Sequence, residues 1–174
     1  MTPLGHAAAS TLLSPRERLP VWPLILAGVA PDVDYLFVWA PQFNALHRVV
    51  THNLFFVLIV AGLCAALWPR AQSRRAMIFA AAVLGGLAHL LVDACMDTNP
   101  TNGLGVAWLW PLSEAFFSPF NLMRLEPNPA GWGDPLAAAR GVIRGLVFEV
   151  PLWLGAAWLW WRRLATPDQD SEES

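Results

Sequence analysis

The chain has 174 residues, of which 56% are hydrophobic and 14% charged, with a formal net charge of −2. Soluble domains carry about 25% charged residues, so this composition excludes a surface that faces water on all sides. All eleven basic residues are Arg, and without a basic stripe the sequence also excludes a nucleic-acid partner. We therefore expect an integral membrane protein with one domain over residues 1–166, followed by a disordered acidic tail at 167–174.

The first two elements are a short helix and an interrupted membrane span. Pro3–Leu13 is too short to cross a bilayer, which takes about 20 residues. Val21–Ala40 is long enough, but Pro31 lacks a backbone donor and predicts a break near Ala30. The two acidic residues that follow the proline should face the protein interior or a watery cavity, and they are Asp32 and Asp34.

Three further spans and one irregular segment follow. Val50–Trp68 and Ala76–Met96 are long and apolar, whereas Val142–Trp161 is long enough but includes Glu149 and Pro151. Asn99–Asn128 is rich in Pro, Gly and aromatic residues, which predicts an interfacial or re-entrant segment. The expected fold is all-α: a polytopic membrane bundle of about four transmembrane helices plus the short N-terminal helix.

The Arg residues predict the orientation. Clusters precede the first span, separate the second from the third, and follow the fourth; they are Arg16 and Arg18, Arg70 with Arg74 and Arg75, and Arg162 with Arg163. The positive-inside rule then places both termini in the cytoplasm. In this topology the acids after Pro31, the start of the second span and the end of the third converge near the outer membrane face.

The His and Asp residues predict a metal site at that face. His89 and Asp93 are four residues apart, so both project from one side of a helix. His47 and His52 are five apart, which indicates that His47 lies on the loop before the second span. Burying several carboxylates without a cation would cost several kcal/mol each. The candidate ligands are His6, Asp32, Asp34, His47, His52, His89 and Asp93.

Nitrogen and oxygen ligands without thiolate favour Zn²⁺, with Mn²⁺ or Fe²⁺ as alternatives. More than four candidate ligands would permit one or two ions, and a bound cation can activate water for hydrolysis. We predict that Asp34 or Asp97 serves as general base and that Arg48 holds an anionic substrate oxygen.

Several short motifs contain these residues. They are a His near the start (His6), Gly-x-x-Pro-Asp-x-Asp (28–34), His-Arg-x-x-Thr-His (47–52), Gly-x-x-x-His-x-x-x-Asp (85–93) and a later Trp-Pro (110–111). Together, over residues 6–113, they resemble the YdjM-type inner-membrane metal-dependent hydrolases, a family distantly similar to bacterial zinc-dependent phospholipase C. The resemblance implies a hydrolase of the bacterial inner membrane.

The expected partners are membrane lipid and a lipid-like or lipid-linked substrate with an ester or phosphoester bond, and the chain could form a homo-oligomer. The alternative is a non-catalytic metal-binding membrane protein, either a transporter or a scaffold. An acid-phosphatase-like lipid phosphatase ranks low, because the chain has neither Lys nor a Pro-Ser-Gly-His motif. A glutamyl intramembrane protease is unsupported, since no span contains a paired-Glu motif.

Overall fold

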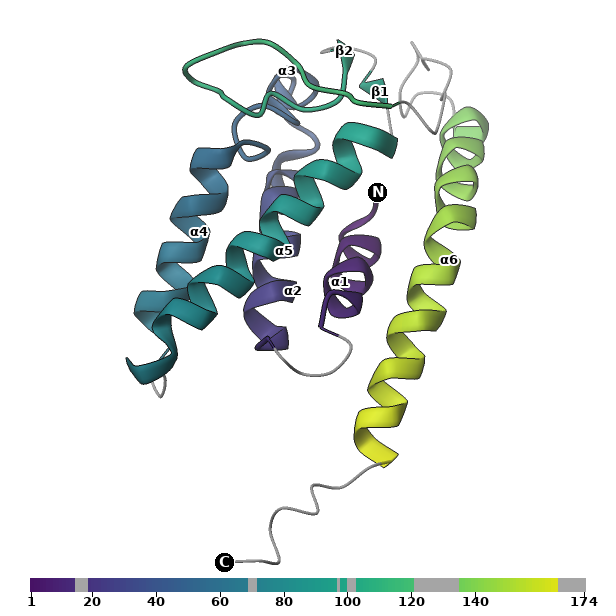
Figure 1. The fold of residues 1–174 in the computed structure, drawn as a ribbon. Coiled ribbons are helices and arrows are strands. Elements are labelled where there is room, and N and C mark those ends of the chain that lie inside the picture. The colour runs from purple at the N-terminus through teal and green to yellow at the C-terminus, as the bar shows by residue number, and fades with distance from the viewer. Residues whose placement is uncertain (15–18, 69–71, 97, 100–102, 121–134, 166–174) are drawn as a thin grey trace, which may run out of the picture.

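The computed structural model describes residues 1–14, 19–68, 72–96, 98–99, 103–120 and 135–165, and its architecture is helical (Figure 1). The elements in chain order are α1 (Pro3–Leu12), α2 (Val21–Val29), the 3-10 helix η1 (Ala30–Phe37), α3 (Phe43–Leu46), α4 (Leu54–Leu67), the 3-10 helix η2 (Gln72–Arg74), α5 (Arg75–Met96), β1 (Thr98–Asn99), β2 (Gly103–Leu104) and α6 (Pro135–Ala165). The antiparallel strands β1 and β2 have two residues each, so the predicted helical class holds.

The helix ends follow from local chemistry. α1 begins with a proline, and the side chain of its cap, Thr2, accepts a hydrogen bond from Gly5 N. The predicted break of the first span occurs where α2 gives way to η1, with Pro31 near the start of η1. Asn53 caps α4 by accepting a hydrogen bond from Phe56 N, so this helix starts four residues later than the sequence predicts.

α6 differs most from the sequence expectation. We predicted a span from Val142, but the helix begins at Pro135, because a proline is well suited to the first turn of a helix. Pro151 lies inside it without ending it. The predicted interfacial segment contains β1, β2 and a bridge between Val106 and Phe117, while residues 121–134 and the tail lie outside the described part.

α5 lies at the centre of the bundle, where it packs against α2 and α4, and α1 packs against α2 and α6. Two glycines permit these close approaches. A Cβ at Gly85 of α5 would lie 2.2 Å from Leu24 O of α2, and one at Gly28 of α2 would lie 1.9 Å from Ser10 Oγ of α1. A larger residue at either position would therefore push two helices apart.

The helices alternate in direction, so the bundle has two distinct ends (Figure 1). One end contains η1, α3, the start of α4 and the end of α5. The other contains the start of α5 with Arg75 and the end of α6 with Arg162 and Arg163. The N-terminus lies toward the first end (Figure 1). The location of both termini in the cytoplasm stays a prediction.

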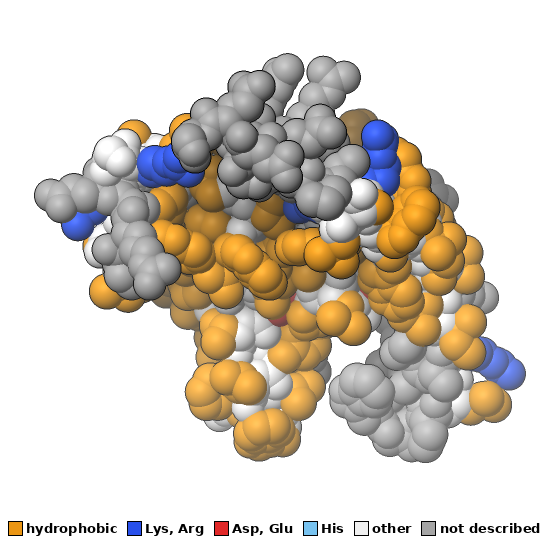
Figure 2. Space-filling view, turned by 90° about the horizontal axis from the view of Figure 1, so that it is seen from below, with side chains coloured by type: hydrophobic (Ala, Val, Ile, Leu, Met, Phe, Trp, Pro, Cys, Tyr) orange, Lys and Arg blue, Asp and Glu red, His pale blue; other side chains and the backbone are white. Residues whose placement is uncertain are grey.

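Within the described residues, α5 is the helix with both the length and the apolar composition to cross a membrane, whereas α4 is apolar but has 14 residues. The four-span count therefore stays a prediction. Figure 2 views the bundle from its second end, and hydrophobic side chains make up most of the described surface seen there.

Candidate metal centre

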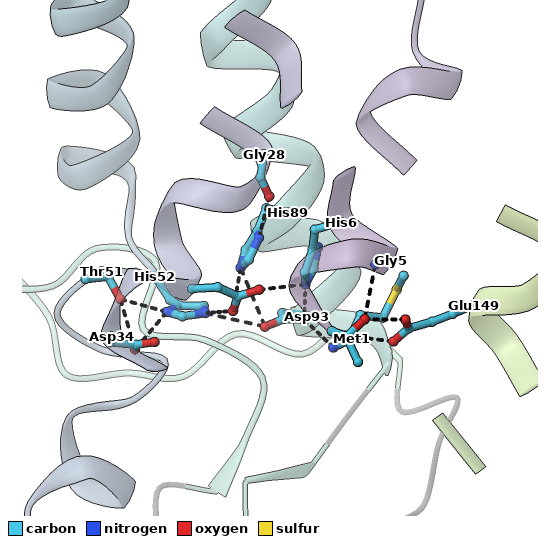
Figure 3. A network of polar contacts seen from close by, with 12 residues as sticks. Met1, Gly5, His6, Gly28, Asp34, Thr51, His52, His89, Asp93 and Glu149 are labelled. Atoms are coloured by element: carbon cyan, nitrogen blue, oxygen red, sulfur yellow. Dashed lines mark hydrogen bonds and ion pairs between the residues drawn. The ribbon is translucent and has the colours of Figure 1, made fainter. Parts of the chain in front are cut away.

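Imidazole and carboxylate groups from four segments meet near one end of the bundle (Figure 3). α1 contributes His6, η1 contributes Asp32, the turn before α4 contributes His52, and α5 contributes His89 and Asp93. All five residues are buried. We call these five residues the buried cluster.

The acids of the buried cluster lie between its imidazoles. Nε2 of His52 is 3.7 Å from Asp32 Oδ1 and 3.5 Å from Asp93 Oδ2. Nε2 of His89 is 3.9 and 3.8 Å from the same two oxygen atoms. Ligand atoms bound to one tetrahedral zinc at about 2.0–2.1 Å lie about 3.3 Å from one another. The two imidazoles and two carboxylates are thus spaced nearly as ligands of one cation.

His6 completes this arrangement from α1. Its Nε2 lies 3.1 Å from Asp93 Oδ1 and 4.0 Å from Asp32 Oδ2. His6, Asp32, His89 and Asp93 each offer one ligand atom such that all four atoms lie within 4.8 Å of one another. The short N-terminal helix therefore takes part in the cluster, as the sequence predicts for His6.

The other ring nitrogen of His89 fixes its tautomer. Nδ1 donates a hydrogen bond of 2.8 Å to the backbone carbonyl of Gly28, which is buried between α1 and α5. Nε2 consequently has a lone pair directed at Asp32 and Asp93. A backbone carbonyl on the second nitrogen is the usual support for a metal-binding imidazole, because it orients the ring and increases its basicity.

Thr51 performs the same task for His52. Its hydroxyl donates to Asp34 Oδ2 at 3.1 Å, so its oxygen accepts the hydrogen bond from His52 Nδ1 at 3.0 Å. In the neutral ring, this order leaves Nε2 of His52 as an acceptor on the side that faces Asp32 and Asp93. The chain from Asp34 through Thr51 to His52 therefore aims a second lone pair at the same point.

Several polar atoms of the buried cluster have no hydrogen-bond partner. They include Nε2 of His52, Nε2 of His89 and Oδ2 of Asp32. Buried polar atoms are nearly always paired, and each unpaired one costs about 1–3 kcal/mol. Several acceptors that converge without donors fit a cation, which would satisfy all of them at once. The donor set, imidazole with carboxylate, fits Zn²⁺, Mn²⁺ or Fe²⁺.

A second group adjoins the first at its outer side. His47 Nδ1 lies 2.9 Å from Asp34 Oδ2, and both side chains are partly exposed, at 11% and 15%. His52 Nδ1 is 3.7 Å from the same oxygen, so His52 belongs to both groups. Asp34 Oδ1 is buried without a hydrogen-bond partner. These groups are closer to solvent than the buried cluster, which suits exchange of protons.

Arg48 lies beside Asp93. Its guanidinium is 3.8 Å from Asp93 Oδ2 and donates a hydrogen bond of 3.5 Å to the backbone carbonyl of the same residue. Arg48 is buried and has a φ of 67°, a left-handed conformation that is uncommon for a side chain of this size. The loop after β2 covers it, because Ala107 N donates a hydrogen bond to Arg48 O.

α6 supplies a polar contact that sequence reasoning missed. Glu149 is 1% exposed, and its carboxylate accepts hydrogen bonds from Thr2 N at 2.6 Å and from the Thr2 hydroxyl at 2.5 Å. The Met1 amino group lies 3.1 Å from Asp93 Oδ1. Glu149 thus fastens the start of α1, the helix that presents His6. The signal in the sequence was an acid within an apolar segment, which we read as an interruption.

The structure brings together eight of the nine predicted site residues as members or neighbours of the two groups. They are His6, Asp32, Asp34, His47, His52, His89 and Asp93, with Arg48 in contact with Asp93. Asp97, the alternative general base, lies outside the described residues. Sequence reasoning also missed the roles of Gly28 and Asn53, whose side chain donates to the carbonyls of residues 49 and 50.

Comparison with known proteins gives a family and one relative. A family model described as YdjM inner membrane protein matches residues 2–166. The chain is 31% identical over 172 residues to the inner membrane protein YbcI of Escherichia coli (strain K12), with 92% of each chain covered. No solved structure matches.

Proposed function

Because the chain belongs to the YdjM inner membrane protein family, we propose that it is a membrane-embedded metal-dependent hydrolase. Its substrate in this proposal is an ester or phosphoester of a lipid or lipid-linked molecule. The observation that carries the proposal is the pair of buried, unpartnered Nε2 atoms of His52 and His89, which face the carboxylates of Asp32 and Asp93.

In the proposal, the buried cluster holds one cation, with Zn²⁺ preferred and Mn²⁺ or Fe²⁺ as alternatives. Such a cation, when bound, supplies the Lewis acidity that activates water and polarises the scissile bond. His6, Asp32, His52, His89 and Asp93 hold it. Asp34 and His47 are candidates for a second ion, and the close contact between them suits an acid–base pair equally well.

The remaining residues provide proton transfer and charge. Asp34 Oδ1 has no hydrogen-bond partner and is placed beside the cluster, so it can accept a proton from the attacking water. His47 Nδ1 lies against the other oxygen of that carboxylate and can pass the proton toward solvent. Arg48 lies beside Asp93, where its positive charge favours an anionic substrate oxygen.

The proposal includes an arrangement in the membrane. We place α5 across the bilayer, with α2 plus η1, α4 and α6 completing four spans. Arg75, Arg162 and Arg163 lie at the end of the bundle away from the cluster, and by the positive-inside rule we assign that end to the cytoplasm. The cluster is then near the outer face of the inner membrane.

The test is turnover by purified, metal-loaded protein in vesicles of phosphatidylethanolamine and phosphatidylglycerol, with product release followed by mass spectrometry and the metal measured by elemental analysis. We expect turnover with bound metal in the wild type and in Cys64→Ala, a control in α4 outside the cluster. We expect loss of turnover in His52→Ala. Stoichiometric metal without turnover of any lipid ester would instead support the non-catalytic transporter or scaffold. Absence of bound metal would refute both.

A further inference from the structure

Two apolar cavities adjoin each other along α2, and one of them reaches the buried cluster. The first has a volume of about 560 Å³, and its wall includes Ile25, Leu26, Val33 and the cluster residue Asp32. The second has a volume of about 420 Å³, and its wall includes Ile25, Trp22 and Trp160. Ile25 borders both cavities, and the rest of their walls comes from α1, α2, η1 and α6. We call the two cavities together the α2 groove.

The two ends of the α2 groove differ in chemistry. Asp32 is the charged residue in the wall, and its Oδ2 atom has no hydrogen-bond partner. Away from Asp32 the wall is formed almost entirely by aliphatic and aromatic side chains, ending among Trp22, Trp153 and Trp160. α2 spans nine residues, roughly 14 Å of helix. A ligand that fits is therefore an amphiphile with one polar end and a long apolar chain.

The side chains around the groove indicate where such a ligand comes from. Trp22, Leu26, Val33 and Leu36 are large hydrophobic residues, and each is 45% or more exposed. Apolar exposure on this scale suits contact with lipid rather than water. A chain in the groove would pass between these exposed side chains and the cluster without entering water.

We propose that the α2 groove binds one acyl chain of a membrane lipid and places the headgroup linkage of that lipid at Asp32. This inference rests on the proposed function and specifies how its substrate enters: laterally from the bilayer, chain first between α1 and α2. The volumes of both cavities lie within the range of about 300–1,000 Å³ found for small-molecule sites. We take the occupant to be a lipid, because the apolar wall requires an apolar chain and the end at Asp32 requires a polar group that can reach the cluster.

The test uses a phosphatidylethanolamine with a diazirine at the end of one acyl chain, incorporated into vesicles with the full-length protein. After irradiation, mass spectrometry maps the labelled peptides. We expect labelling at the peptides that contain Leu4–Thr11 and Trp22–Ile25. Ile25→Trp, which fills the junction of the two cavities, should reduce this labelling by about tenfold or more. Leu63→Trp on α4 is the matched control, because its side chain is 52% exposed and lines neither cavity.

A second variant guards against misfolding of Ile25→Trp. Val33→Trp alters the wall near Asp32 at a position that is 45% exposed, so the fold should accept it, and we expect the same reduction in labelling. Equal labelling of all helices, or labelling that neither variant reduces, would overturn the inference. Photolabelling needs neither metal nor turnover. Specific labelling of a protein that holds no metal would therefore refute the proposed hydrolase while leaving the groove in place.

Discussion

The imidazole rings of His6 and His89 stack with their centroids 3.6 Å apart and their planes inclined by 23°. Two stacked rings that both carried positive charge would repel each other, since like charges at this distance are unfavourable. Neutral rings with lone pairs available to a cation avoid this cost. The stacking therefore joins α1 to α5 in a form that suits ligation, and it makes the N-terminal helix part of the candidate metal centre.

Removal of His6 should weaken metal binding. We expect His6→Ala to lower the affinity for Zn²⁺ by at least the roughly 10–100-fold that loss of an outer-shell partner causes, because its Nε2 lies between both acids of the cluster. Competition with a chromogenic chelator measures the affinity. His47→Ala is the comparison, and it should keep at least one tightly bound ion because His47 lies outside the buried cluster. Unchanged affinity in His6→Ala would remove this residue from the site.

Thr51 should act through His52. We expect Thr51→Val to lower metal affinity by about 10–100-fold, because valine has the shape of threonine but can neither accept from His52 Nδ1 nor donate to Asp34. Thr51→Ser retains the hydroxyl and should restore most of the affinity. Equal binding by the valine and serine variants would show that the tautomer of His52 is set by another group.

Substitution by alanine should have different effects on stability at Gly85, which packs against α2, and at Gly62, which packs against nothing. Gly85→Ala should destabilise the protein by about 1–3 kcal/mol, because its Cβ would lie 2.2 Å from Leu24 O. Gly62→Ala in α4 has nothing within 4 Å of its Cβ and should be neutral or stabilising by up to about 1 kcal/mol. Thermal unfolding in detergent compares the two. A stable Gly85→Ala variant with full metal content would contradict the close approach of α2 and α5.

Glu149 should stabilise α1 at a distance from the cluster. We expect Glu149→Ala to cost about 1–3 kcal/mol, because it leaves two partly buried donors of Thr2 without their acceptor. It should also lower metal affinity by loosening the helix that presents His6. Glu149→Gln keeps one acceptor oxygen and should recover part of both losses. Full metal affinity and stability in Glu149→Ala, again by thermal unfolding and chelator competition, would show that α1 docks without this contact.

The sequence predicted the helical class, the break after α2 and the residues that converge, because each leaves a local mark. Pro31 predicts the break after α2, and the i, i+4 spacing of His89 and Asp93 fixes a shared face. The starts of α4 and α6 were misplaced because hydropathy does not report capping. Asn53 decides the first, and Pro135 occupies the first turn of the second.

The support of the site could not be predicted, because it depends on contacts between distant residues. His89 donates a hydrogen bond to a backbone carbonyl 61 residues away, and any residue type supplies such a carbonyl. Glu149 lies 147 residues from Thr2, and in the sequence it resembles a flaw in an apolar span. The polar partners that orient a metal site have no spacing rule comparable to that of its ligands.

Arg48 has a left-handed backbone conformation, which is strained for any residue other than glycine. Glycine adopts a φ of 67° without penalty, whereas other residues pay on the order of 1–2 kcal/mol. A glycine here would relieve this strain, but it would remove the buried guanidinium that lies beside Asp93. The backbone strain at this position therefore accompanies a positive charge held against the buried cluster.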